Sequence, residues 1–197
     1  MTALPHEHPR PTGISHLLTV AEYSQLGEIE SGYAELQEGR LVMSPSPALE
    51  HNSASLELAI QLRAQLPDDL MVIQDIDVDL ELVPPGEPGF SRRPDLMIID
   101  RAARKRVKAE GGMLRASEVL VVVEIVSPGS RRTDYVIKRG EYADAGIPHY
   151  WIVDITDPVS LVDCHLAGAF GYQEAAAVVD EFTTTEPCPI TVHVDEL

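Results

Sequence analysis

The chain has 197 residues, of which 44% are hydrophobic and 24% charged, a balance typical of a globular protein with a sizeable core. No apolar run reaches the roughly 18 residues of a membrane span, and the N-terminal stretch lacks the pattern of a secretory signal. Cys164 and Cys188 form neither a disulfide framework nor a zinc motif, so we expect a cytoplasmic protein with reduced thiols and no membrane partner.

The net charge of -17 argues at first against a nucleic-acid partner, because an acidic protein repels phosphates. The charge is unevenly distributed, however. Between Arg92 and Arg139 lie 12 of the 15 Lys and Arg residues but only 6 of the 32 acids, so this window carries +6 and the remainder -23. Either the window forms a basic surface around its acidic residues, or its densest part is a loop at 101–108 that is solvated by cations.

The first predicted elements follow a segment, residues 1–16, that is rich in Pro and His and that we expect to be a flexible N-terminus. A single domain is expected over residues 17–197. The stretch TVAEYSQLG predicts a short helix with Thr19 as N-cap and Glu22 in the capping-box position.

The next elements alternate between strand and helix. YAELQEGRLVM predicts a strand or helix end, a turn at Glu38 and Gly39, and a strand at 40–43. HNSASLELAIQLRAQL has apolar residues at helical spacing and predicts a helix that ends before Pro67.

The stretch QDIDVDLEL alternates strictly between acidic and apolar residues, which predicts a strand with one solvated face. Its four carboxylates, Asp75, Asp77, Asp79 and Glu81, allow two interpretations: a ladder of metal ligands, or a charged edge that resists aggregation. The second interpretation is favoured.

The second half of the chain predicts a buried sheet. PDLMIID is a short apolar strand, and VLVVVEIV is a near-continuous β-branched run, typical of a strand buried on both faces. SRRTDYVIKRGEYADAG predicts a helix capped by Gly146, and HYWIVDI a further strand. LVDCHLA and GYQEAAAV predict a meander of strands near the C-terminus.

Two carboxylates stand out in this sheet. Asp95 opens one strand and Glu124 interrupts the next, where an isolated buried carboxylate would cost several kcal/mol or take up a proton. If the two converge at one edge of the sheet, a cation between them relieves the repulsion, and hard oxygen ligands suit Mg2+ or Mn2+. The alternative is that Glu124 pairs with an arginine such as Arg92 or Arg93.

The following helix carries Asp134, Lys138 and Tyr142 at i, i+4 and i+8, on one face. One interpretation is an ordinary surface ion pair beside a packed tyrosine. If the face looks back at the sheet, Lys138 reaches the carboxylates, where it can orient or help deprotonate an attacking water, or offset charge in a transition state.

Together, YAELQEGRLVMSPSPALEH, RRPDLMIID and VLVVVEIVSPGSRRTDYVIKRGEYADAGIPHYWIVD resemble the Uma-two family, within the PD-(D/E)XK nuclease superfamily. The resemblance covers roughly residues 17–180. It implies an α/β (α+β-like) fold with a restriction-endonuclease-like core: a central mixed β-sheet flanked by helices.

The resemblance also implies roles for single residues. Asp95 matches the aspartate of the Pro-Asp motif, and Glu124 the acidic residue of the second motif, which makes these two the metal ligands. Position 126, where the family pattern expects lysine, is Val126. Lys138 on the helix is therefore expected to replace it, and Glu35 matches a glutamate near the metal.

The substrate side is expected to involve His51, Arg131, Arg132 and Tyr142. His51 matches a histidine common after the Ser-Pro loop, although a buried or helix-capping role is favoured for it. Arg131 and Arg132 are expected to hold phosphates without distinguishing bases.

The implied function is that of a Mg2+-dependent (or Mn2+-dependent) endonuclease hydrolysing phosphodiester bonds of DNA. Two alternatives remain: a nuclease-fold module that binds nucleic acid or a protein with little hydrolysis, and a phosphohydrolase acting on a small nucleotide. A homodimer is expected, since a symmetric pair cuts both strands of a duplex most easily.

Overall fold

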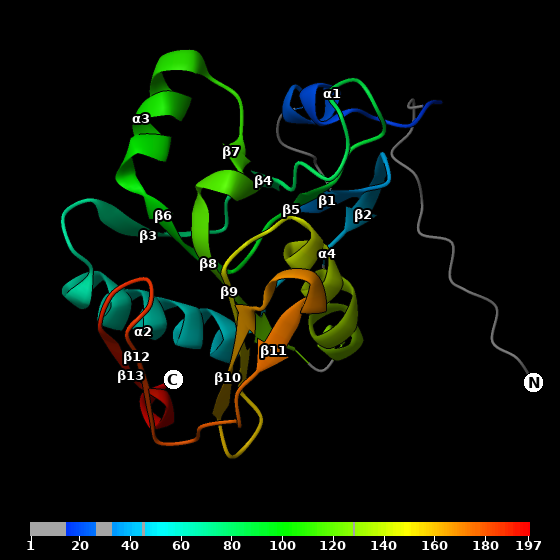
Figure 1. The fold of residues 1–197 in the computed structure, drawn as a ribbon. Coiled ribbons are helices and arrows are strands. Elements are labelled where there is room, and N and C mark those ends of the chain that lie inside the picture. Colours follow the sequence, from blue (N-terminus) through cyan, green and yellow to red (C-terminus); the bar gives the residue numbers. More distant parts are fainter. Residues whose placement is uncertain (1–14, 27–32, 45, 128) are drawn as a thin grey trace, which may run out of the picture.

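The computed structural model describes residues 15–26, 33–44, 46–127 and 129–197 (Figure 1). Residues 1–14, and with them most of the expected flexible N-terminus, lie outside the described residues. The described chain is a mixed α/β fold, as the sequence predicted, with a six-stranded sheet, a five-stranded sheet and a two-stranded hairpin.

The six-stranded sheet is the centre of the molecule and has the strand order β11-β10-β9-β8-β6-β3. β8 and β9 are parallel and the other neighbours are antiparallel. The strands are β3 (Leu70–Gln74), β6 (Leu96–Asp100), β8 (Val119–Val126), β9 (His149–Asp154), β10 (Ser160–Leu166) and β11 (Tyr172–Glu174).

Helices and a hairpin cover both faces of this sheet. Helix α2 (Leu49–Gln65) and the hairpin of β12 (Glu181–Thr184) and β13 (Ile190–His193) pack on one face, through a core that includes Leu58, Leu62 and Trp151. Helices α3 (Arg101–Glu110) and α4 (Arg139–Asp144) contribute to the core on the other face.

The five-stranded sheet has the order β2-β1-β5-β4-β7. Its strands are β1 (Ala34–Gln37), β2 (Arg40–Met43), β4 (Val78–Asp79), β5 (Ser91–Arg92) and β7 (Leu114–Arg115). The predicted turn between β1 and β2 is confirmed, with positive φ angles of 49° at Glu38 and 73° at Gly39. Residues 93–95 lead directly from β5 into β6 and so connect the two sheets.

Local signals explain most helix boundaries. Helix α1 (Val20–Ser24) begins with the predicted capping box between Thr19 and Glu22, and α2 ends before Pro67, as predicted. Gly146, at φ 75°, ends α4, and the Ile147 N–H returns to the Tyr142 carbonyl at 3.1 Å.

Two predictions about local structure are wrong. The segment 101–108, predicted as a loop, is helix α3, because the Asp100 side chain caps it by accepting the Ala102 N–H at 2.7 Å, and its residues are good helix formers. Apart from Gln74, which ends β3, QDIDVDLEL forms only the two-residue strand β4, because Asp75 and Glu81 adopt positive φ angles of 51° and 54° on either side of it.

The predicted helix after β8 is present, but its first part is π-helical and not α-helical. Residues Thr133–Lys138 form a π-helical stretch (η2) that continues directly into α4. Such wide turns are rare and frequently lie at functional sites. In the described part of the chain, no helix combines the length and apolar character needed to cross a bilayer.

Candidate active site

Asp95 lies directly before β6, where the chain enters the central sheet. Its Oδ2 atom accepts the main-chain N–H of Ile125 at 2.6 Å and lies 3.3 Å from His51 Nε2. The side chain is 15% exposed, so it reaches solvent. The contact with the Asp95 carboxylate raises the pKa of His51, although partial burial opposes this. Asp95 is thus held beside the residue that follows Glu124.

Glu124 lies within β8 and is 3% exposed. Its Oε1 atom accepts two hydrogen bonds, from Lys138 Nζ at 2.9 Å and from Tyr142 OH at 2.6 Å. Burial raises the pKa of Glu124 to about 8, against the attraction of Lys138. The partner of Glu124 is therefore Lys138, and the alternative of a pairing with Arg92 or Arg93 is wrong.

Lys138 lies among three carboxylates. Its Nζ atom is 2.9 Å from Glu124, 3.3 Å from Glu35 and 3.8 Å from Asp134. Burial opposes its charge, but the carboxylates raise the pKa of Lys138 above its ordinary value. The helix face carrying Asp134, Lys138 and Tyr142 is buried, so it looks toward the sheet and is not a surface ion pair.

Arg92 supports this cluster from β5 and is 2% exposed. It donates to Glu35 Oε2 at 2.8 Å and to both carboxylate oxygens of Glu141 at 2.6 and 2.7 Å. Burial opposes ionisation of Glu35, but Lys138 and Arg92 hold its pKa below the usual value. Sequence reasoning missed Glu141; its position three residues after Lys138 on the same helix was the available signal.

Asp95 and Glu124 are the residues that could hold a hard divalent cation. Among the described residues, Asp95 Oδ1 and Glu124 Oε2 accept no hydrogen bond, although the opposite oxygen of each carboxylate does. Two carboxylates with water and phosphate oxygens are a common Mg2+ environment. No cluster of three or more His, Cys, Asp or Glu side chains suited to a metal occurs in the described ranges.

The remaining predicted site residues occupy different positions. His51, in the first turns of α2, contacts Asp95 and is not a helix cap. Tyr142 is completely buried behind Glu124, which places it as a support of that carboxylate and away from a substrate surface. Arg131 forms an ion pair with Asp154 and lies over the Tyr135 ring at 5.0 Å, while Arg132 is exposed.

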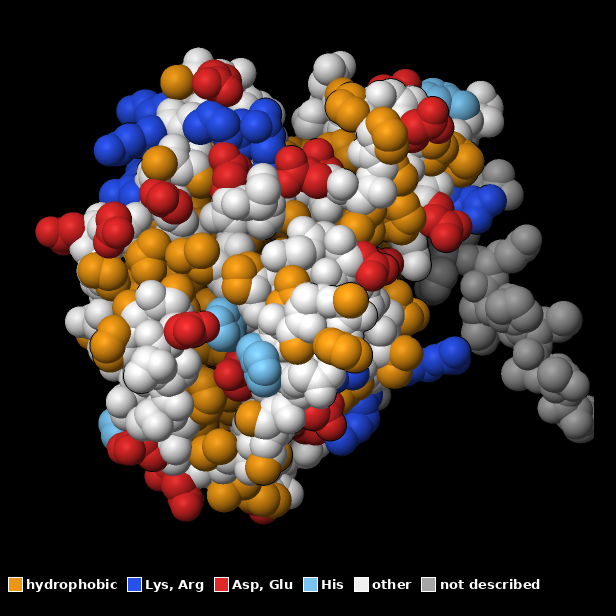
Figure 2. Space-filling model, viewed as in Figure 1, with side chains coloured by type: hydrophobic (Ala, Val, Ile, Leu, Met, Phe, Trp, Pro, Cys, Tyr) orange, Lys and Arg blue, Asp and Glu red, His pale blue; other side chains and the backbone are white. Residues whose placement is uncertain are grey.

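The basic window does not form one continuous face. Lys and Arg side chains gather over α3 (Figure 2). Helix α3 follows Asp100 at one end of β6, whereas Asp95 lies at the other end of that strand. Arg92 is buried in its ion pairs, and Arg106 is paired with Glu118. Arg139, next to Lys138, lies 3.4 Å from Glu174, and Arg131 pairs with Asp154. Arg132 therefore remains as the exposed cation near Asp134 with no ion pair among the described residues.

Comparisons with known proteins bear on this arrangement. The Uma2 family model, described as "Putative restriction endonuclease", matches residues 20–190. Among solved structures, the chain is similar to one described as a putative nuclease belonging to DUF820 from Anabaena variabilis. The TM-score is 0.63 at 15% identity, over 86% of this chain and 89% of that one. This identity supports a likeness of fold alone. No curated protein matches the chain.

Proposed function

Because this chain belongs to the Uma2 family of restriction-endonuclease-like proteins, we propose that it is a metal-dependent endonuclease that hydrolyses phosphodiester bonds of DNA. One observation carries the proposal: Asp95 and Glu124 each keep an oxygen free of described hydrogen bonds, beside a buried lysine. Nucleases of this superfamily generally use divalent metals, so Mg2+ or Mn2+ is the expected cofactor.

Asp95 and Glu124 are the residues that would hold the cation. When bound, it would activate water for in-line attack and offset charge on the phosphate oxygens. The chain already prepares both carboxylates: the Ile125 N–H fixes Asp95 at 2.6 Å, and Tyr142 and Lys138 fix Glu124 at 2.6 and 2.9 Å. Rigid ligands reduce the reorganisation needed in the transition state.

Lys138 acts in this proposal as a cation and not as a base. Its raised pKa keeps it protonated, and its protons point at Glu124 and Glu35, at 2.9 and 3.3 Å. It therefore positions Glu124 and contributes positive charge near the scissile phosphate. The expectation that Lys138 helps to deprotonate water is replaced by this role. Glu35 in turn holds Lys138 from β1.

Arg132, which is exposed, is the side chain that we expect to contact substrate phosphates, with Arg131 beside it. Contacts of this kind position a duplex without distinguishing its bases. A homodimer remains our expectation, because cleavage of two antiparallel strands suits two sites related by a twofold axis.

The test is incubation with supercoiled plasmid and with single-stranded DNA, in Mg2+, Mn2+ or EDTA. Wild-type protein should cleave only with metal. Asp95→Asn and Glu124→Gln should abolish both cleavage and Mn2+ binding measured by calorimetry. Lys138→Met should slow cleavage by about 10²-fold, as expected for a lost electrostatic group. Asp144→Asn is the control, because Asp144 is exposed on α4 and forms no described ion pair.

The possible outcomes separate the hypotheses. Metal binding without cleavage would replace the nuclease by a binding module of the same fold. Turnover of free nucleotides, with DNA left intact, would indicate the small-nucleotide phosphohydrolase. Undiminished cleavage by Asp95→Asn and Glu124→Gln would mean that the chemistry lies elsewhere.

A further inference from the structure

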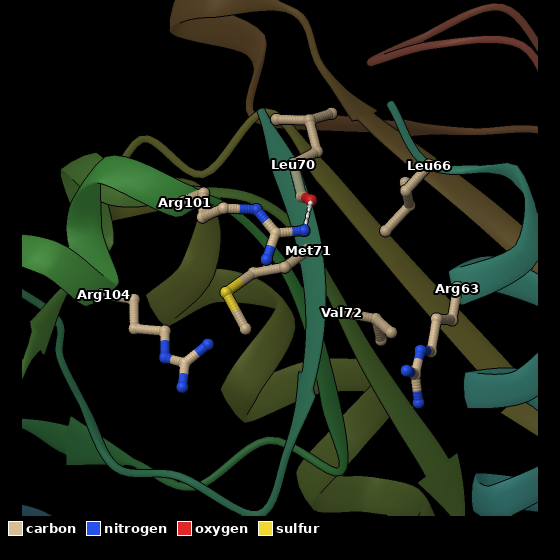
Figure 3. Close-up of a pocket in the computed structure, with 7 residues that line it drawn as sticks. All are labelled: Arg63, Leu66, Leu70, Met71, Val72, Arg101 and Arg104. Atoms are coloured by element: carbon tan, nitrogen blue, oxygen red, sulfur yellow. Dashed lines mark hydrogen bonds between the residues drawn. The ribbon is translucent and has the colours of Figure 1, made fainter. Parts of the chain in front are cut away.

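A cavity of 330 Å³ opens beside β3, which is the last strand of the six-stranded sheet. Three arginines, Arg63, Arg101 and Arg104, surround an apolar floor that includes Met71 and Val72 (Figure 3). The cavity lies beside the first half of β3, whereas Gln74, at the other end of the strand, pairs with Leu96, the residue after Asp95. β3 pairs with β6 so that Leu70 lies opposite Asp100, about five residues or roughly 17 Å along the strand from Asp95.

The outer edge of β3 carries unused main-chain groups. Asp69 O accepts the Arg101 N–H at 2.7 Å, and the Asp75 N–H donates to Asp95 O at 3.3 Å, so odd-numbered residues turn their peptide groups toward β6. Val72 and Gln74 therefore turn theirs outward. Within the described ranges these groups have no hydrogen-bond partner. They lie two residues apart, which is the repeat that an added strand would match.

The free edge of β3 ends at Leu70, whose main-chain groups already have hydrogen-bond partners. Its N–H donates to Pro67 O at 3.0 Å, and its carbonyl accepts Arg101 Nη2 at 3.0 Å. Arg101 also donates through Nε to the Asp68 carbonyl at 2.8 Å. The guanidinium of Arg101 is thus fixed at one end of the free edge by main-chain oxygens and is not neutralised by a carboxylate there.

The arginines flank the edge on both faces of the sheet. Arg63 comes from α2, which packs on one face, and Arg101 and Arg104 come from α3, on the other (Figure 3). Among the described residues, none of the three forms an ion pair with a carboxylate. In a chain of net charge -17, three such guanidiniums around one strand edge are an unusual concentration of uncompensated positive charge.

We propose that the free edge of β3 and its arginine-lined cavity bind an extended acidic peptide segment of a partner protein by strand addition. The main chain of the segment would pair with Val72 and Gln74. Successive side chains of a strand point to opposite faces, so adjacent acidic residues would reach Arg63 on one face and Arg101 or Arg104 on the other. Arginine forks suit carboxylates in this geometry.

The same features disfavour two other occupants. A second copy pairing through β3 would bring the same three arginines face to face, and like charges oppose that contact. A nucleic-acid strand would satisfy the arginines but offers no repeating donors and acceptors to match the outward groups of Val72 and Gln74. The proposal goes beyond the nuclease function and does not depend on it.

The test uses a fluorescein-labelled peptide of about ten residues, with consecutive glutamates at its centre and valine and threonine around them. Full-length protein should bind it, with binding followed by fluorescence anisotropy. A lysine-for-glutamate peptide should not bind. A peptide that keeps the glutamates but has proline at alternate positions should also fail, because it lacks the N–H donors that strand pairing needs. Binding of the proline peptide as tightly as the parent would reduce the site to charge attraction and overturn strand addition.

Variants locate the site. Arg63→Glu and Arg104→Glu should each weaken binding about tenfold or more, whereas Lys105→Glu, on the same helix but outside the cavity, should change it little. Val72→Pro removes an outward N–H and leaves the ladder to β6 intact, as edge-strand proline does, so it should abolish binding while the thermal melt stays cooperative. The proposal would be overturned if wild type does not bind the peptide, or if Lys105→Glu loses as much binding as Arg63→Glu and Arg104→Glu. It would also be overturned if single-stranded DNA displaces the peptide and the same arginine variants weaken DNA binding.

Discussion

Arg92 offers a direct test of how the candidate site is held together. It is 2% exposed and binds Glu35 and Glu141, whose side chains are 5% and 13% exposed. Arg92→Met keeps the volume but removes the charge. Glu35 retains Lys138 at 3.3 Å and the Arg93 N–H at 3.1 Å, whereas Glu141 loses both of its short bonds. Most of the lost stability therefore comes from Glu141, whose largely buried charge loses its cationic partner.

Breaking a buried ion pair from one side costs about 3–5 kcal/mol. With a urea m value of about 2 kcal/mol/M, the unfolding midpoint should fall by roughly 1.5–2.5 M. The matched control is Arg106→Met. Arg106 also binds a carboxylate through two nitrogens, but the Arg106 and Glu118 side chains are 17% and 18% exposed, so the shift should stay below roughly 0.5 M.

A second variant tests the cause. Arg92→Met combined with Glu141→Gln should recover more than half of the lost stability, because the unpaired charge is removed as well. Urea unfolding followed by circular dichroism measures wild type and all three variants. The reasoning is refuted if Arg92→Met costs no more than Arg106→Met, or if adding Glu141→Gln brings no recovery.

Two further predictions concern other parts of the fold. Gly140→Ala should raise the melting temperature by about 1–3 °C, because a Cβ there meets no atom within 4 Å and glycine disfavours the helix; a lower melting temperature by calorimetry would contradict this. The Asp163 carboxylate, 3.6 Å from His149 Nδ1, raises the pKa of His149, so protonation stabilises the fold at low pH, and this contribution is lost as pH rises through the raised pKa. As pH rises above about 6.5, the melting temperature should fall more steeply for wild type than for His149→Gln, and parallel slopes would count against the contact.

The central strand and its site could be predicted from the sequence because their signals are local. A β-branched run marks β8, and a carboxylate within it requires a partner. The i, i+4, i+8 spacing of Asp134, Lys138 and Tyr142 correctly placed that partner on the next helix. The register of antiparallel β6 and β8 then brings Asp95 beside the residue after Glu124.

Other features had no local signal. Arg92 finds Glu141 and Glu35 across 49 and 57 residues, and only the packed fold brings them together. The alternation of QDIDVDLEL predicted a long strand but could not reveal the positive φ angles that interrupt it. The cation-rich segment at 101–108 was predicted as a loop from its charge, although a capping aspartate preceded it.

In β8, the main chain of Ile125 holds Asp95 of the candidate site, while its side chain packs in the core, so the two requirements are independent. Any amino acid except proline supplies that N–H, so the side chain at 125 is free to serve the core on the α2 face, where Ile125 packs with Val123. Glu124 points the other way, toward Lys138 and Tyr142. Evolution can therefore exchange aliphatic residues on the apolar side of β8. The position of the Asp95 carboxylate stays the same, because it depends on a main-chain N–H and not on the side chain.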